Sequence, residues 1–197
     1  MKSRRFRAFL SFNIHWYILI FVFVVFGFYY LFLTLNTPSY DEKIVVFIGA
    51  KYVDLEIEKD LYEGFEDTLI KEVFVDYSDP SDSNFSMVFS TRGTVNTDIL
   101  ILPYDYMKEE SYSTFFAEIN EELLAFDDEL ISDSNGNVYG INVTDFLSEY
   151  TEISGDFYLF FNKKSNKISS LNGISNNDYA LDILKNILEG VEDEKEG

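Results

Sequence analysis

The chain of 197 residues contains no cysteine, and its only histidine is His15. Without cysteine it can form no disulfide, carry no lipid-modified thiol and offer no thiolate nucleophile. The usual catalytic triads need a histidine, and the usual zinc sites need histidine or cysteine. The sequence also has no phosphate-binding glycine loop and no kinase motif. We therefore expect no enzymatic activity, no cofactor and no metal.

Charged side chains are missing from residues 8–40, although they make up 25% of the chain. The centre of this stretch, residues 16–35, reads WYILIFVFVVFGFYYLFLTL. Twenty helical residues span about 30 Å, which is the thickness of the hydrocarbon core of a bilayer. A cleaved signal peptide is the alternative, but its apolar region has typically about 7–15 residues and a small-residue cleavage site. The sequence predicts a permanent transmembrane helix.

The two signs of charge are separated by this helix. Lys2, Arg4, Arg5 and Arg7 precede it, and all 35 acidic residues follow it, beginning with Asp41. Lys and Arg beside a transmembrane helix stay on the cytoplasmic side. We therefore expect a single-pass protein of the cell membrane with its N-terminus inside and its C-terminal domain extracytoplasmic.

The 157 residues from 41 to 197 suffice for one domain with a hydrophobic core. They carry 11 cations against 35 anions, a balance that repels nucleic acid and anionic lipid. An exported domain without cysteine is typical of bacterial surface proteins. The expected organisation is a basic cytoplasmic N-terminus (1–15), a transmembrane helix (16–35), a short linker (36–42), an extracytoplasmic domain (43–190) and an acidic tail (191–197).

Strand and helix patterns alternate along this domain. Apolar runs bounded by turn residues predict strands over 43–49, 72–77, 98–102, 138–143 and 157–162. Apolar residues at helical spacing predict helices over 55–69, 85–91 and 112–123, and a last helix that starts near 176 and ends at Gly190. This order predicts an α/β fold in three layers, with a mostly parallel sheet flanked by helices.

Four short motifs lie in order along these elements. They are KIVVFIG at 43–49, TDILILP at 97–103, GNVYGINV at 136–143 and YLFFNKK at 158–164. In order and spacing they resemble the first lobe of bacterial extracellular solute-binding proteins of the type II periplasmic-binding fold, in particular the sugar-binding group that serves ABC importers. The resemblance covers about residues 43–168. It implies a solute-binding lobe, a small ligand such as a sugar, and an ABC permease, a solute receptor or a second copy of the chain as partner.

The chain also departs from that family. Its members normally have two lobes that close on the ligand, whereas this sequence has room for one. Gram-positive members are held by a lipidated cysteine, whereas a transmembrane helix is expected here. Asn142 stands where the family motif YGxP has proline. The resemblance therefore implies a shortened, membrane-tethered relative that acts as an accessory or sensor module.

The carboxyl ends of the predicted strands are the expected binding site, because ligands of open parallel sheets bind beyond those ends. Tyrosine rings beside carboxylates and amides suit sugars, by stacking and by hydrogen bonding. The expected ligand-binding residues are Lys51, Tyr52, Tyr104, Asp105, Tyr106 and Asn142. The alternative is that these are ordinary loop residues, and that the domain has lost ligand binding and docks on another protein.

Two oxygen-rich segments, 76–82 and 127–137, need a test for calcium binding. Neither fits the EF-hand register: counted from Asp133, Gly136 falls at position four rather than six, and Thr144 replaces the closing Glu. Segments rich in Asp, Ser and Asn commonly form turns. We therefore expect turns at both places.

Overall fold

The computed structural model describes residues 14–63, 65, 68–119, 129–165, 167, 182–184 and 187. The chain divides into two compact units, residues 1–39 and 40–197. Several predicted segments lie wholly or partly outside the described residues: residues 1–13 of the basic N-terminus, residues 120–123 of the helix at 112–123, most of the last helix and the acidic tail.

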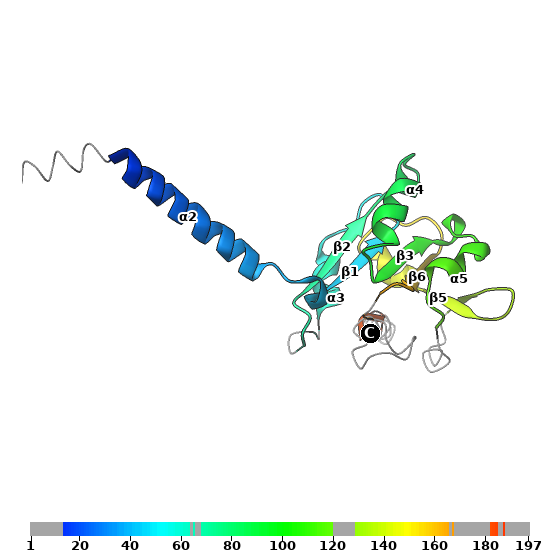
Figure 1. Ribbon diagram of the computed structural model, residues 1–197. Helices are drawn as coiled ribbons and strands as arrows, with labels where there is room; N and C mark the ends of the chain where they lie inside the picture. Colours follow the sequence, from blue (N-terminus) through cyan, green and yellow to red (C-terminus); the bar gives the residue numbers. More distant parts are fainter. Residues whose placement is uncertain are drawn as a thin grey trace, which may run out of the picture. The chain divides into compact units, whose positions relative to one another are not determined.

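The first unit contains the long apolar helix α2 (Ile14–Asn36), which includes the predicted span (Figure 1). By length and composition it could cross a membrane, and all of its residues are exposed. The Thr34 hydroxyl donates to the carbonyl of Tyr30 at 2.9 Å, and the hydroxyl of Thr37, the residue after the helix, donates to that of Leu33 at 2.7 Å. Such internal pairing suits a helix in an apolar medium.

The second unit is built on one sheet of six strands in the order β2-β1-β3-β6-β5-β4 (Figure 1). The strands are β1 (Lys43–Ile48), β2 (Glu72–Tyr77), β3 (Ile99–Pro103), β4 (Leu130–Ser132), β5 (Val138–Asn142) and β6 (Phe157–Phe161). β1 pairs in parallel with β2 and β3, as predicted. The pairs β3–β6, β6–β5 and β5–β4 are antiparallel, so the sheet is mixed and the expectation of a mostly parallel sheet is wrong.

A tight turn explains part of that error. β4 and β5 are joined by a short loop that contains Gly136 at a φ of 87°, a left-handed conformation that glycine adopts without strain. Strands joined by so short a loop must run antiparallel. The sequence pattern predicted β5 but not its three-residue partner β4.

The helices that the structure describes in the second unit are short. They are α3 (Glu56–Tyr62), α4 (Phe85–Val88), α5 (Tyr112–Phe115) and α6 (Thr144–Ser148), the π-helical turn η2 (Phe89–Gly93), and the 3-10 turns η1 (Tyr40–Glu42), η3 (Tyr104–Tyr106) and η4 (Glu109–Ser111). The helices predicted over 55–69 and 112–123 are shorter than expected. The second ends because Phe116 is extended and forms a β-bridge with Asn162.

Buried side chains form one cluster on each face of the sheet. The first cluster is mostly aliphatic and joins alternate residues of the strands to α3, α6 and the described residues of the last helix. The second is mostly aromatic and joins the opposite residues of the strands to α4, η2 and α5. Helices therefore cover both faces of the sheet in the part of the chain that the structure describes, as an α/β fold requires.

Gly140 lies directly beside a ring of the aromatic cluster. Gly140 of β5 pairs with Phe160 of β6, and a Cβ added to Gly140 would lie 2.7 Å from the Phe160 ring. The Phe160 ring in turn stacks on Phe116, with ring centres 4.3 Å apart. The glycine of the YGIN motif therefore makes room for this aromatic stack.

Replacing Gly140 with alanine is expected to lower the free energy of unfolding by about 1–3 kcal/mol, because the ring must shift in a well-packed core. The effect can be measured by urea denaturation of the full-length protein in detergent, followed by near-UV circular dichroism. If the substitution leaves the midpoint unchanged, then Phe160 does not pack on this backbone.

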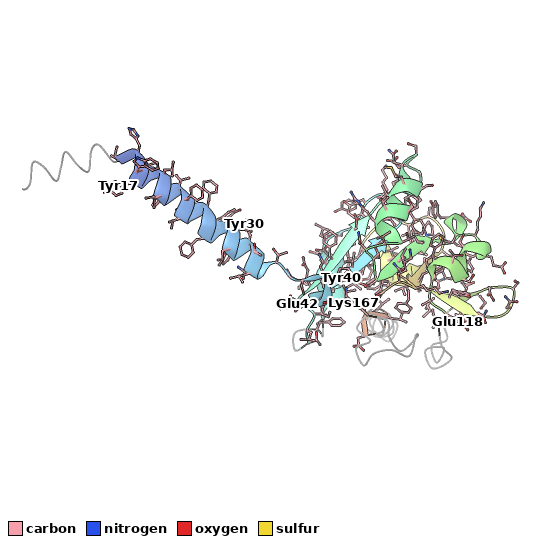
Figure 2. The ribbon with its side chains drawn as sticks, in the orientation of Figure 1. Tyr17, Tyr30, Tyr40, Glu42, Glu118 and Lys167 are labelled. Carbon is pink, nitrogen blue, oxygen red and sulfur yellow. The ribbon has the colours of Figure 1, made fainter. Side chains whose placement is uncertain are left out.

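A buried ion pair between Lys167 and Asp98 lies beside the first residue of β3. Asp98 is fully buried just before β3, and its carboxylate accepts hydrogen bonds from the Lys167 ammonium at 2.9 Å, the Ser165 hydroxyl at 2.6 Å and the Val45 amide at 3.0 Å. The Lys167 ammonium lies 4.1 Å from the centre of the Tyr40 ring (Figure 2). These contacts attach η1, where the second unit begins, to the sheet.

Candidate functional site

An open cavity of about 660 Å³ lies where β3 ends and where β6 and β4 begin. Its carboxylates are those of Asp105, Glu109, Glu129 and Asp156, and its tyrosines are Tyr104, Tyr112 and Tyr158. Met107, Leu130, Ile131 and Ser132 complete the wall. A concave surface with a few convergent polar groups is the usual form of a small-molecule site.

The strand directions bring these residues together. Because β6 is antiparallel to β3, its first residues meet the last residues of β3, and the Tyr104 amide donates to the Asp156 carbonyl at 2.9 Å. Glu129 precedes β4, and its carbonyl accepts a hydrogen bond from the amide of Asn142 at 2.9 Å. Three segments far apart in the sequence therefore meet at one end of the sheet.

The tyrosines form an aromatic wall for the cavity. The rings of Tyr104 and Tyr158 are 5.8 Å apart between centres, and the Tyr112 ring lies 6.1 Å from that of Phe160. Burial raises the pKa of Tyr158, and the nearby carboxylates of Glu129 and Asp156 raise it further. Burial also raises the pKa of Tyr112, with further contributions from Tyr104 and Glu109. Both hydroxyls are therefore neutral near neutral pH and can donate hydrogen bonds.

The Tyr112 hydroxyl is available to a ligand. Tyr112 is 4% exposed, and none of the described residues forms a hydrogen bond with its hydroxyl. Every fully buried side-chain nitrogen or oxygen within the described ranges has a partner. The hydroxyl must therefore reach solvent, and the solvent beside it is the cavity that Tyr112 lines.

The charge of the site is entirely negative among its described lining residues. Four acidic residues line the cavity, and none of the described lining residues is Lys, Arg or His. Glu129 is oriented by Asn142, whose side-chain amide donates to its carboxylate at 3.2 Å. The arrangement can hold a ligand by hydrogen bonds, by aromatic contact and by charge.

The residues expected from the sequence fall into three groups. Tyr104 and Asp105 line the cavity, and Asn142 lies behind it and holds Glu129. The Tyr106 ring packs edge-on against Phe85, with centres 4.4 Å apart, and so belongs to the aromatic cluster.

Lys51 and Tyr52 follow β1 and are not among the residues that line the cavity. The Tyr52 ring lies 6.5 Å from that of Tyr77 at the end of β2. The cavity therefore joins the residues after β3 to residues beside β4 and β6. The residues after β1 are not part of its described lining.

Sequence analysis missed Tyr112, Glu129, Asp156 and Tyr158. Asp156 and Tyr158 stand at the start of a predicted strand, where a parallel sheet would place them far from the end of β3. An antiparallel assignment for β6 would have found them.

Residues 133–137 form a turn before β5, as expected, but residues 130–132 of the same oxygen-rich segment form strand β4, and residues 127 and 128 lie outside the described residues. The Asp133 carboxylate accepts hydrogen bonds from the amides of Asn135 at 2.9 Å and Asn137 at 3.0 Å. Partial desolvation acts to raise the pKa of Asp133, but these hydrogen bonds outweigh it and lower the pKa. Within the described residues, no group of three or more His, Cys, Asp or Glu side chains is arranged to hold a metal ion.

Alkaline pH is expected to destabilise the domain through its buried tyrosines. The pKa values of Tyr112, Tyr139 and Tyr158 are all raised above 10.0, chiefly by burial. A raised pKa stabilises the fold below the unfolded value, and that contribution is lost as the pH rises through the folded value. Stability should fall above about pH 10.

Denaturation midpoints from pH 8 to 11, with phenolate absorbance at 295 nm, test this expectation. Full ionisation of all tyrosines at one pH without loss of structure would contradict it.

Comparison of the chain with protein-family models, with curated proteins and with solved structures finds no match.

Proposed function

We propose that the protein is a single-pass membrane protein whose second unit lies outside the cell and binds a small polar solute. The observation that carries this proposal is the cavity at the end of β3, lined by three tyrosines and four carboxylates. No nucleophile–histidine pair can form there, since the only histidine is His15 in α2. The proposed function is binding rather than catalysis, because the described lining residues include neither histidine nor cysteine for a nucleophilic triad.

The anchor and its orientation rest on α2 and on the charges around it. α2 has 23 residues and no charged side chain, and the four cations before it predict a cytoplasmic N-terminus. The negative charge of the rest of the chain favours a position in solvent, away from anionic lipid. Residues 40–197 then work close to the outer surface of the membrane.

The resemblance to one lobe of type II solute-binding proteins supports a role in solute uptake or sensing. The parallel arrangement β2-β1-β3 and the helices on both faces agree with such a lobe. We propose an accessory or sensor module of ABC-type import, with sugars as the solutes that the resemblance implies. The partner would be an ABC permease, a solute receptor or a second copy of this chain.

The absence of cysteine allows a direct test of the orientation. Ser154 is exposed in the loop before β6, and Ser154→Cys would give the chain a single thiol. A membrane-impermeant maleimide should label this variant in intact cells, and a cysteine placed at Ser3 should be labelled only after permeabilisation. The reverse pattern would overturn the proposed topology.

Solute binding is tested by the thermal unfolding of the full-length protein in detergent, with sugars, amino acids and amines at millimolar concentration. A ligand should raise the unfolding temperature, and Tyr104→Ala with Asp105→Ala should abolish the rise. Lys51→Ala with Tyr52→Ala is the matched control and should keep it. If no solute stabilises the protein, or if only the control pair abolishes stabilisation, the proposed site is wrong.

One observation favours the alternative of a protein-docking module. β2 is an edge strand of the described sheet, and large apolar side chains are exposed on it or near α3: Phe74, Tyr77, Tyr52, Leu55 and Leu69. Such exposed apolar residues often mark contact surfaces. Cross-linking in native membranes, followed by mass spectrometry, should capture a partner that Phe74→Ser with Leu69→Ser loses, if docking is the function.

A further inference from the structure

We infer that the ligand of this cavity is a small organic cation, specifically a protonated amine. This inference rests on the proposed function and specifies the chemical class of its solute. It differs from the neutral sugar that the resemblance implies.

The first argument is charge. Asp105, Glu109, Glu129 and Asp156 line one open cavity, and none of the described lining residues is cationic. Carboxylates that share a cavity repel each other, and a bound cation would relieve that repulsion. A neutral sugar would leave the repulsion in place, and an anionic solute would increase it. The negative charge of the whole domain would also attract a cation toward the site.

The second argument comes from the tyrosines. An ammonium group is attracted to the face of an aromatic ring, and the Tyr104 and Tyr158 rings lie 5.8 Å apart between centres at the cavity. Both of these tyrosines line the same cavity as Glu129 and Asp156. The ring faces and the carboxylates thus offer an amine two kinds of favourable contact at one place.

The third argument is the hydroxyl of Tyr112. It reaches the cavity without a hydrogen-bond partner among the described residues, although the side chain is almost entirely buried. A polar group in such a position has an unfilled hydrogen-bonding capacity. A ligand with a second polar group besides its amine would use it.

A metal ion fits the cavity less well than an amine. Calcium takes six to eight oxygen ligands at about 2.3–2.6 Å, which requires several carboxylates that converge on one point. No group of three or more such side chains converges in this way within the described ranges. Carboxylates spread around an open cavity instead suit a ligand that carries its charge on a larger organic body.

Isothermal titration of the full-length protein in nanodiscs of zwitterionic lipid tests the inference, with agmatine and spermidine as amines and glucose and maltose as neutral sugars. One amine should bind saturably at one site per chain. Glu129→Gln with Asp156→Asn should weaken that binding tenfold or more, because a charge-assisted contact is worth about 1.5–3 kcal/mol. Glu56→Gln with Glu72→Gln removes two exposed charges on α3 and β2 and should change it less than about threefold.

The outcomes separate the two levels of the proposal. The inference is overturned if the binding of amines does not saturate. It is also overturned if both pairs of substitutions weaken amine binding equally. If glucose or maltose binds and Tyr104→Ala abolishes it, the solute site stands and the amine class is wrong. If neither amines nor sugars bind, and no other solute stabilises the protein, both the site and its ligand class are wrong.

Discussion

Replacing Lys167 with methionine is expected to lower the free energy of unfolding by about 3–5 kcal/mol, because one partner of a buried ion pair is removed. The Asp98 carboxylate would keep its hydrogen bonds from Ser165 and Val45 but would lose its only described counter-charge. A fully buried carboxylate without a cation is costly in a medium of low dielectric constant. Urea denaturation of the full-length protein in detergent measures the change.

Two further variants separate the ion pair from a general effect of losing a lysine. Lys164→Met removes an exposed lysine three residues away and should change stability by less than about 0.5 kcal/mol. Adding Asp98→Asn to Lys167→Met removes the uncompensated charge, so the double variant should be more stable than Lys167→Met alone. A double variant that is less stable than either single one would show that the pair does not act as a unit.

Replacing Phe160 with alanine is expected to cost a similar amount, about 3–5 kcal/mol, by opening a cavity in the aromatic cluster. Phe160 is 1% exposed, stacks on Phe116 at 4.3 Å and lies 6.1 Å from the Tyr112 ring. Phe74→Ala is the matched control, because Phe74 is 44% exposed on β2 and should cost much less. Equal costs for the two substitutions would contradict the packing described here.

Gly140 and Phe160 should also show strong coupling. Gly140→Ala is destabilising because its new methyl group meets the Phe160 ring. In the Phe160→Ala background that ring is absent, so Gly140→Ala should cost close to nothing. A double-mutant cycle measures this coupling, and simple additivity of the two costs would show that the methyl group meets another obstacle.

The elements with strong local patterns could be predicted from the sequence. The apolar span in α2 and the strands β1, β2 and β3 appear where continuous apolar runs stand in the chain. β5 and β6 also appear at their predicted positions. These segments depend on local composition, because a run of apolar residues must be buried or placed in lipid whatever its neighbours are.

Strand direction could not be predicted in the same way. The runs at 138–143 and 157–162 show that strands exist, but nothing local says that β6 enters the sheet beside β3 and antiparallel to it. That single placement decides the site, because it brings Asp156 and Tyr158 to the end of β3. Tyr104 and Asp105 could be predicted since they follow β3 directly, whereas Glu129 and Tyr112 come from segments that meet only in the folded chain.

Polar residues beside the strands also have roles that the sequence did not indicate. Asp98 and Asn162 look like ordinary ends of strands. In the structure Asn162 is buried. Its side-chain amide donates to the Thr97 carbonyl at 2.7 Å, and its backbone amide donates to the Asp98 carbonyl at 2.9 Å. The TDILILP and YLFFNKK motifs are thus joined by a buried polar network, which is a long-range feature.

The most direct test of the solute site is fluorine NMR of the full-length protein with 3-fluorotyrosine, in nanodiscs, during titration with agmatine or spermidine. Signals can be assigned by single Tyr→Phe substitutions. We expect saturable shifts at Tyr104, Tyr112 and Tyr158, with Tyr52 and Tyr77 unchanged. Shifts at Tyr52 and Tyr77 without shifts at the cavity tyrosines, or an unchanged spectrum with every solute, would contradict a binding site at the end of β3.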